Sequence, residues 1–148
     1  MQRTAREMAY NRVEFVLRNE TEIRRTVNER RAELSANGHS GGGSTGHAFV
    51  SDPTAIQAIK AVEPLKAVTL NSGYTVHSPE KWLDIVTLMY SHYPQADMMR
   101  YFYAGHNAIQ TGEKFHFSER QVYYLRDDFR QMGVEIACQY GLTRVIDI

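Results

Sequence analysis

Residues 107–142, NAIQTGEKFHFSERQVYYLRDDFRQMGVEIACQYGL, carry the strongest local folding signals in the chain. Ser118 and Gln121 have the S-x-x-Q spacing of a capping box, in which each side chain satisfies a backbone donor at the start of a helix. Apolar residues then recur at steps of three and four, namely Val122, Leu125, Phe129, Met132 and Ile136. This period predicts an amphipathic helix that begins at Ser118 and stops at Gly141.

The residues before this helix fit the first helix and the turn of a helix-turn-helix. Two helices that cross closely need a small residue at the crossing, and Gly112 lies six positions before the capping serine. Phe115 and Phe117 supply apolar side chains at the turn. We therefore predict a helix-turn-helix at about residues 107–140. The alternative is an ordinary capped helix in a bundle, with its charged residues facing solvent.

The N-terminal half of the second helix, with a lysine before it, holds the candidate contacts to DNA. Arg and Gln side chains can make two hydrogen bonds to a base edge, whereas Tyr and Ser suit phosphate oxygens. The candidate DNA-binding residues are Lys114, Ser118, Glu119, Arg120, Gln121, Tyr123, Tyr124 and Arg126. Because the capping box partly occupies Gln121, Arg120 is the stronger candidate for reading sequence.

The chain as a whole is predicted to be all-α, in three parts. Residues 1–36 form a charged N-terminal helical arm, in which a helix over residues 9–34 carries a narrow apolar seam. Residues 37–50, NGHSGGGSTGHAFV, form a flexible Gly/Ser joint that begins at a helix-ending Asn-Gly pair. Residues 51–148 form a helical bundle that ends in the helix-turn-helix and its long C-terminal helix.

The apolar seam and the Gly-rich joint each allow a second interpretation. Periodicity does not name the partner of the seam, which packs either on its own domain or on a second copy in a homo-oligomer. A phosphate-binding loop would need a lysine beside Ser or Thr and a strand leading into it. Residues 37–50 have neither, so we interpret them as a joint.

Three further helices are predicted between the joint and the helix-turn-helix. Proline in the first turn favours helices over residues 53–72 and from Pro79 to Tyr93, and a break near Pro64 is an alternative for the first of them. Another helix covers about residues 95–104 and is closed by a glycine. The best strand candidate, residues 74–77, is too short to predict a sheet.

Composition narrows the function. The 148 residues allow one domain with an arm, but not two large domains. Lys and Arg number 17 and balance 17 Asp and Glu, so any contact with nucleic acid must be local. A single cysteine, Cys138, and the lack of a signal or membrane-spanning segment predict a cytoplasmic protein. The histidines fit no metal or nucleophile motif, so we expect no enzyme, metal site or cofactor.

The order of parts resembles the phage and prophage transcription regulators of the RinA and ArpU type. The resemblance rests on Ser51–Ala55 (SDPTA), the run Trp82–Tyr103 and Ser118–Tyr124 (SERQVYY), and it covers most of the chain. It implies a C-terminal unit like sigma-factor region 4, double-stranded DNA as ligand, host RNA polymerase as a second partner and late-gene control in a bacterial host. The sequence departs from the family at Thr111, where such helices have an apolar residue.

Two other functions stay open. A small terminase subunit or a similar DNA-packaging adaptor would also join a helix-turn-helix to an oligomerising helix. A large closed ring would favour packaging, whereas a monomer or dimer favours regulation. The last alternative is a helical adaptor that binds only proteins and fails to bind duplex DNA at low salt.

Overall fold

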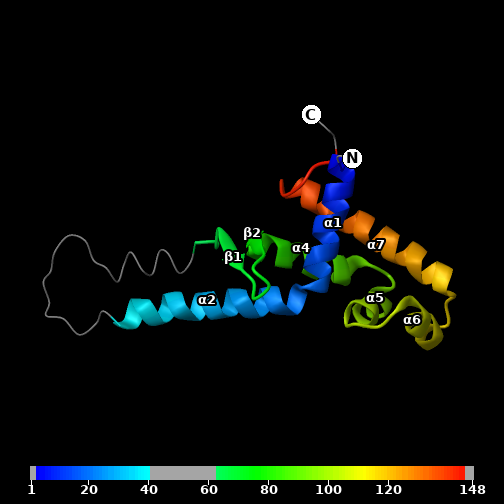
Figure 1. The fold of residues 1–148 in the computed structure, drawn as a ribbon, viewed down its shortest axis with the longest axis horizontal. Coiled ribbons are helices and arrows are strands. Elements are labelled where there is room, and N and C mark those ends of the chain that lie inside the picture. The colour runs from blue at the N-terminus through cyan, green and yellow to red at the C-terminus, as the bar shows by residue number, and fades with distance from the viewer. Residues whose placement is uncertain (1–2, 41–62, 146–148) are drawn as a thin grey trace, which may run out of the picture. The chain divides into compact units, whose positions relative to one another are not determined.

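A computed structural model describes residues 3–40 and 63–145 of the chain (Figure 1). These ranges form helices and one two-stranded sheet, in the order α1 (Ala5–Arg18), α2 (Glu20–Ser40), β1 (Ala67–Thr69), β2 (Thr75–His77), α4 (Pro79–His92), α5 (Ala96–Tyr103), α6 (Ala108–Phe115) and α7 (Glu119–Gln139). The predicted all-α class is confirmed. The chain divides into two compact units. The helical unit is Met1–Glu20 with Lys81–Ile148, and the hairpin unit is Thr21–Glu80.

The N-terminal region forms two helices, α1 and α2, whereas the sequence predicted a single helix over residues 9–34. The break is at Asn19. Its side-chain amide donates to the Phe15 carbonyl at 2.8 Å, and its backbone N–H donates to the same oxygen at 3.0 Å. Asparagine competes in this way with the continuing helix, because its side chain offers the backbone another partner.

The hairpin unit corrects two predictions. β1 pairs antiparallel with β2, with Val68 opposite Val76, so a short sheet exists where none was predicted. Residues 63–72 contain β1 and are not helical, whereas residues 53–62 of the helix predicted there lie outside the described residues. Each strand has only three residues in an exposed–buried–exposed pattern, which is too short for its period to stand out in the sequence.

Helix α2 extends further than predicted. It continues to Ser40, so the helix end expected at Asn37-Gly38 is wrong, and residues 41–50 of the predicted joint lie outside the described residues. Polar contacts connect α2 to the rest of the hairpin unit. Arg31 donates to a Glu80 carboxylate oxygen at 2.6 Å, and Glu22 accepts from the backbone N–H of Asn71 at 2.8 Å.

The core of the helical unit is built around α7, which packs against α1. Val13 and Val16, two residues of the predicted N-terminal seam, are buried here, so this part of the seam packs within its own chain. The apolar stripe predicted on α7 is confirmed at Val122 and Phe129, which are both fully buried. The other predicted stripe residues, Leu125, Met132 and Ile136, are only half-buried. The buried face continues instead through Gly133, Val134 and Ala137.

Gly133 lies where α7 packs against Val13 of α1 and Met89 of α4. A Cβ atom added there would lie 2.8 Å from Val13 Cγ1 and 2.7 Å from Met89 Cε. Real Cβ atoms do not come this close to their neighbours, so the close packing of the three helices at this point requires a glycine.

Gly133→Ala is expected to lower the free energy of unfolding by about 1 kcal/mol. Alanine improves helix propensity by about 1 kcal/mol, whereas overpacking a core costs about 1–3 kcal/mol. The end of Met89 can swing aside, but the β-branched Val13 is stiff. Urea denaturation followed by circular dichroism measures the change. In a protein that already carries Val13→Ala, adding Gly133→Ala should lower the free energy of unfolding much less than it does in the wild type. A Gly133→Ala protein more stable than the wild type would contradict the packing explanation.

Candidate nucleic-acid interface

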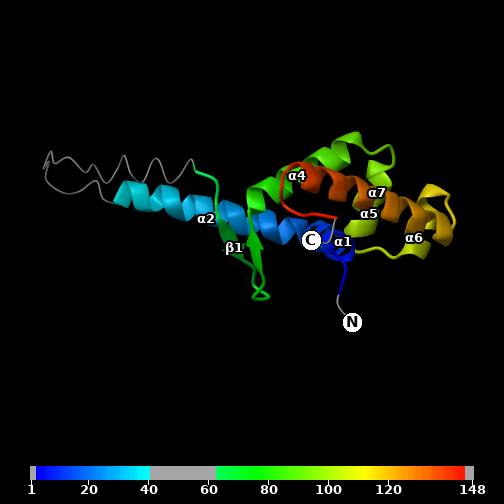
Figure 2. The same ribbon diagram turned by 90° about the horizontal axis from the view of Figure 1, so that it is seen from above.

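Helices α6 and α7 are joined by a tight turn over residues 116–118. In both Figure 1 and Figure 2, α6 lies beside the beginning of α7, with α5 next to it. His116 adopts the left-handed conformation with φ 65°, and the backbone N–H groups of His116 and Phe117 both donate to the Gly112 carbonyl. A Cβ atom on Gly112 would lie 2.3 Å from the Phe117 carbonyl oxygen. Only glycine fits this turn without a backbone shift.

Capping boxes fix the start of both helices. The predicted box of α7 is confirmed, because Gln121 N–H donates to Ser118 Oγ at 3.1 Å and Ser118 N–H donates to Gln121 Oε1 at 2.8 Å. A second box, between Asn107 and Gln110, starts α6. It was missed in the sequence, although N-x-x-Q carries the same kind of signal.

Thr111, the departure from the regulator family, is fully buried in α6. Its hydroxyl donates to the Asn107 carbonyl at 2.8 Å, so the polar group is satisfied inside its own helix. A threonine with its hydroxyl bonded in this way presents mainly its methyl group to the core. The position therefore tolerates threonine in place of an apolar residue.

The structure brings part of the predicted site together on the first turns of α7. Glu119, Arg120, Tyr123 and Tyr124 line an open hollow of about 300 Å³, together with Asp127, which was not predicted. Tyr124 is 61% exposed and Tyr123 is 40% exposed. The Tyr123 and Tyr124 rings are therefore exposed enough to contact a partner.

The other predicted residues are placed differently. Ser118 and Gln121 are engaged in the capping box, which limits what they can offer a ligand. Lys114 is exposed on α6, where its Nζ lies 4.8 Å from the centre of the Tyr101 ring on α5. Lys114 does not line the hollow on α7, although α6 leads directly into that helix.

Both arginines of the predicted site lie over tyrosine rings. Arg120 Cζ is 5.5 Å from the centre of the Tyr124 ring, and its Nη2 donates to the Tyr124 hydroxyl at 3.2 Å. Arg126 Cζ is 4.9 Å from the centre of the Tyr123 ring. The two arginines differ in exposure, because Arg120 is exposed whereas the Arg126 side chain is only 22% exposed.

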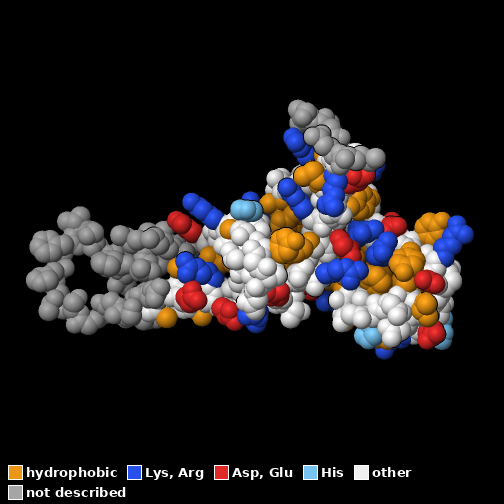
Figure 3. Space-filling model, viewed as in Figure 1, with side chains coloured by type: hydrophobic (Ala, Val, Ile, Leu, Met, Phe, Trp, Pro, Cys, Tyr) orange, Lys and Arg blue, Asp and Glu red, His pale blue; other side chains and the backbone are white. Residues whose placement is uncertain are grey.

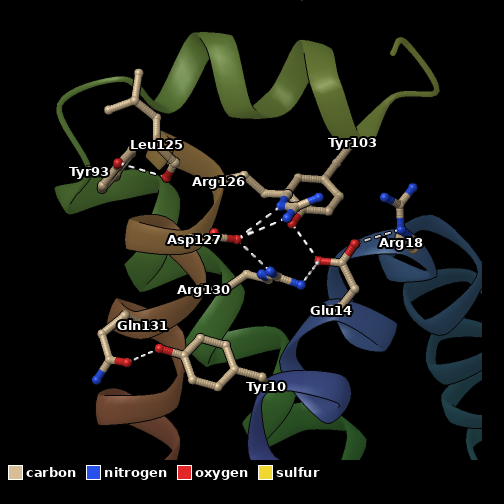
Figure 4. Close-up of polar contacts among 10 residues, drawn as sticks. All are labelled: Tyr10, Glu14, Arg18, Tyr93, Tyr103, Leu125, Arg126, Asp127, Arg130 and Gln131. Atoms are coloured by element: carbon tan, nitrogen blue, oxygen red, sulfur yellow. Dashed lines mark hydrogen bonds and ion pairs between the residues drawn. The ribbon is translucent and has the colours of Figure 1, made fainter. Parts of the chain in front are cut away.

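A chain of polar contacts runs from Arg126 into the helical unit (Figure 4). Asp127 accepts from Arg126 at 3.0 Å and from Arg130 at 2.5 Å. Arg130 also lies 3.6 Å from Glu14 of α1, and the Tyr103 hydroxyl donates to the same carboxylate at 2.6 Å. Glu14 is far from Arg130 and Tyr103 in the sequence, so no local pattern could have predicted its contacts, whereas Asp127 pairs with neighbours in its own helix.

This network changes the acidity of two of its members. Burial raises the pKa of Tyr103 above its ordinary value, and the neighbouring Glu14 carboxylate raises it further. Burial alone would raise the pKa of Asp127, but hydrogen bonds from Arg130 and Arg126 outweigh it and lower the pKa. Asp127 is therefore a carboxylate at neutral pH, and its charge holds the two arginines.

The charge around the candidate interface is mixed. In Figure 3 the basic and acidic side chains of the described residues alternate over the visible face, with hydrophobic ones between them. Helices α6 and α7 carry Glu113, Glu119, Asp127, Asp128 and Glu135 against Lys114, Arg120, Arg126 and Arg130. Attraction of a polyanion must therefore come from a few exposed cations and not from a basic surface.

Comparison of the chain with protein-family models, curated proteins and solved structures finds no match. Within residues 3–40 and 63–145, no group of three His, Cys, Asp or Glu side chains is placed to hold a metal ion. No helix in the same ranges is long and apolar enough to cross a membrane. The resemblance to the RinA and ArpU regulators stays a prediction.

Proposed function

We propose that this protein binds double-stranded DNA through α6 and α7 and regulates transcription. The observation that carries the proposal is the tight turn at Gly112, which joins α6 to a capped helix whose first turns expose Arg120 and Tyr124. In a helix-turn-helix protein, residues near the start of the second helix contact base edges in the major groove. The resemblance to the RinA and ArpU regulators supports late-gene control in a phage or prophage, with host RNA polymerase as a second partner.

The exposed residues take different roles in this proposal. Arg120 reads a base edge, because a guanidinium group presents paired donors that match guanine. The hydroxyls of Tyr123 and Tyr124, and the ammonium group of Lys114, bind phosphate oxygens and set the register on the duplex. Gln121 supports the helix start, since its side-chain oxygen already accepts from the Ser118 backbone.

Arg120→Ala is expected to weaken binding to a selected site by about 1–3 kcal/mol, with much less effect on random duplex. The site would first be obtained by selection from a random duplex pool, and binding would then be measured by fluorescence anisotropy. Arg25→Ala is the control, because it removes the same charge from an exposed position on α2. That control should change neither affinity substantially.

The other results would each revise the proposal. Equal losses on selected and random DNA would assign Arg120 to the phosphate backbone instead of a base. Unchanged binding to both would remove the beginning of α7 from the interface. If the wild-type chain binds no duplex even at low salt, DNA is not its ligand, since non-specific binding is strong under that condition.

A protein-binding adaptor is the second candidate, and one observation favours it. The exposed tyrosines 123 and 124 lie among balanced charges, and aromatic residues are enriched at protein interfaces. An adaptor would leave the duplex pool unenriched in the selection experiment. The DNA-packaging alternative would instead bind DNA as a large closed ring, which native mass spectrometry would detect.

A further inference from the structure

Asp127 concentrates three hydrogen bonds on one oxygen. Its Oδ1 accepts from Arg126 Nε at 3.2 Å and from Arg126 Nη2 at 3.0 Å, and it also accepts from Arg130 Nη2 at 2.5 Å (Figure 4). The Asp127 side chain is 53% exposed. The carboxylate therefore sits at the surface of α7 while it holds the guanidinium group of its neighbour in the chain.

Arg126 is held on two sides. Asp127 binds the Nε and Nη2 edge, and the Tyr123 ring lies 4.9 Å from the guanidinium carbon. An arginine binds a phosphate best when two adjacent N–H groups point at it, and here one such pair is already used. The Asp127 half of this ion pair is 53% exposed, and ion pairs that reach solvent stabilise a fold only weakly, so losing Asp127 would free the arginine at little cost in stability.

Arg130 is the other arginine on Asp127, and it would stay in place. Its side chain is only 19% exposed, and its Nη1 lies 3.6 Å from Glu14. Removal of the Asp127 charge therefore leaves Arg130 a carboxylate partner on α1. Arg126 is therefore the arginine that loses its only carboxylate partner among the described residues when the Asp127 charge is removed.

We propose that Asp127 restrains DNA binding by withholding Arg126 from the phosphate backbone. This inference rests on the proposed DNA-binding function and names a residue that limits it. Arg126 lies further along α7 than Arg120, the proposed base contact, at a position where the second helix of a helix-turn-helix can reach the DNA phosphate backbone. A phosphate contact strengthens binding to every duplex, so withholding one lowers the affinity for the random DNA that competes with the true site.

The test is Asp127→Asn, which keeps the shape of the side chain and removes its charge. Affinity for a fluorescent duplex of random sequence would be measured by anisotropy over a series of salt concentrations. The affinity at low salt is expected to rise about five-fold, and the slope of log K against log salt should steepen by about 1, the value for one added phosphate contact. Circular dichroism should show an unchanged fold, and Asp127→Ser provides a second variant if asparagine disturbs it.

A double-mutant cycle separates the release of Arg126 from the general change in charge. Arg126→Gln alone should change the affinity little, because the wild-type arginine is already engaged by Asp127. Asp127→Asn should then give less than a two-fold gain in the Arg126→Gln background. Asp97→Asn is the matched control, since it removes one exposed carboxylate from α5 and should also give less than a two-fold gain.

Three results would overturn the inference while the wild type still binds DNA. They are an equal gain in the Arg126→Gln background, an equal gain from Asp97→Asn, and an unchanged or lower affinity for Asp127→Asn. A lower affinity would mean that Asp127 orients Arg126 toward DNA instead of withholding it. A wild-type chain and an Asp127→Asn variant that both fail to bind at low salt would instead reject the proposed DNA-binding function.

Discussion

Phe129→Ala is expected to lower the free energy of unfolding by about 3–5 kcal/mol. The Phe129 ring is fully buried, and its centre lies 5.1 Å from the Tyr90 ring, 4.9 Å from the Tyr93 ring and 6.3 Å from the Tyr103 ring. Truncation would therefore remove buried apolar area and leave a cavity among three large side chains. Urea denaturation followed by circular dichroism gives the change.

The matched control is Tyr124→Ala, because Tyr124 is an aromatic residue of the same helix but is 61% exposed. A surface substitution of this kind should alter the free energy of unfolding by less than about 0.5 kcal/mol. Phe129→Leu should give an intermediate loss, since it keeps much of the buried volume. Similar losses for Phe129→Ala and Tyr124→Ala would show that burial of the Phe129 ring does not stabilise the fold.

Gly112→Ala is expected to destabilise the protein by about 2–3 kcal/mol. The added Cβ would meet the Phe117 carbonyl oxygen at 2.3 Å, and a backbone atom cannot rotate aside as a side chain can. Overpacking costs about 1–3 kcal/mol where side chains adjust, and more is expected here because the turn itself must open. The gain of about 1 kcal/mol in helix propensity offsets only part of that cost.

Two measurements check the Gly112 prediction. Urea denaturation should give a larger loss than Gly133→Ala, where the nearest atoms belong to the side chains of Met89 and Val13. Under the proposed function, DNA affinity should also fall, because an opened turn displaces the beginning of α7. Stability equal to that of the wild type would mean that the turn relaxes easily and that Gly112 does not fix the α6–α7 geometry.

The features predicted correctly from the sequence depend on neighbours within a few positions. The capping box joins residues 118 and 121, and the helix stop at Gly141 uses backbone bonds from Gly141 to Cys138 and from Leu142 to Ala137. Gly112 and Gly133 could also be singled out, because a glycine inside a helix needs a packing reason. These signals involve residues that are close together in the chain, so they can be recognised in a single sequence.

The sequence patterns missed the two strands, the break between α1 and α2, and the true end of α2, each for a physical reason. Three-residue strands are too short for a visible period, and the side-chain bond that ends α1 at Asn19 competes with a helical pattern that continues on both sides. At α1 the predicted helix was too long, whereas at α2 it was too short, because α2 continues through Asn37-Gly38 to Ser40. Helix-ending residues favour a stop without enforcing one.

Patterns in the sequence were sufficient to predict the all-α class and the start and stop of α7. The contacts between helices became visible only in the packed structure. Glu14 of α1 lies beside Arg130 of α7, and the Tyr103 hydroxyl of α5 donates to the same carboxylate. The reason is that helix starts and stops depend on residues close in sequence, whereas ion pairs between helices form only once packing has placed distant segments side by side.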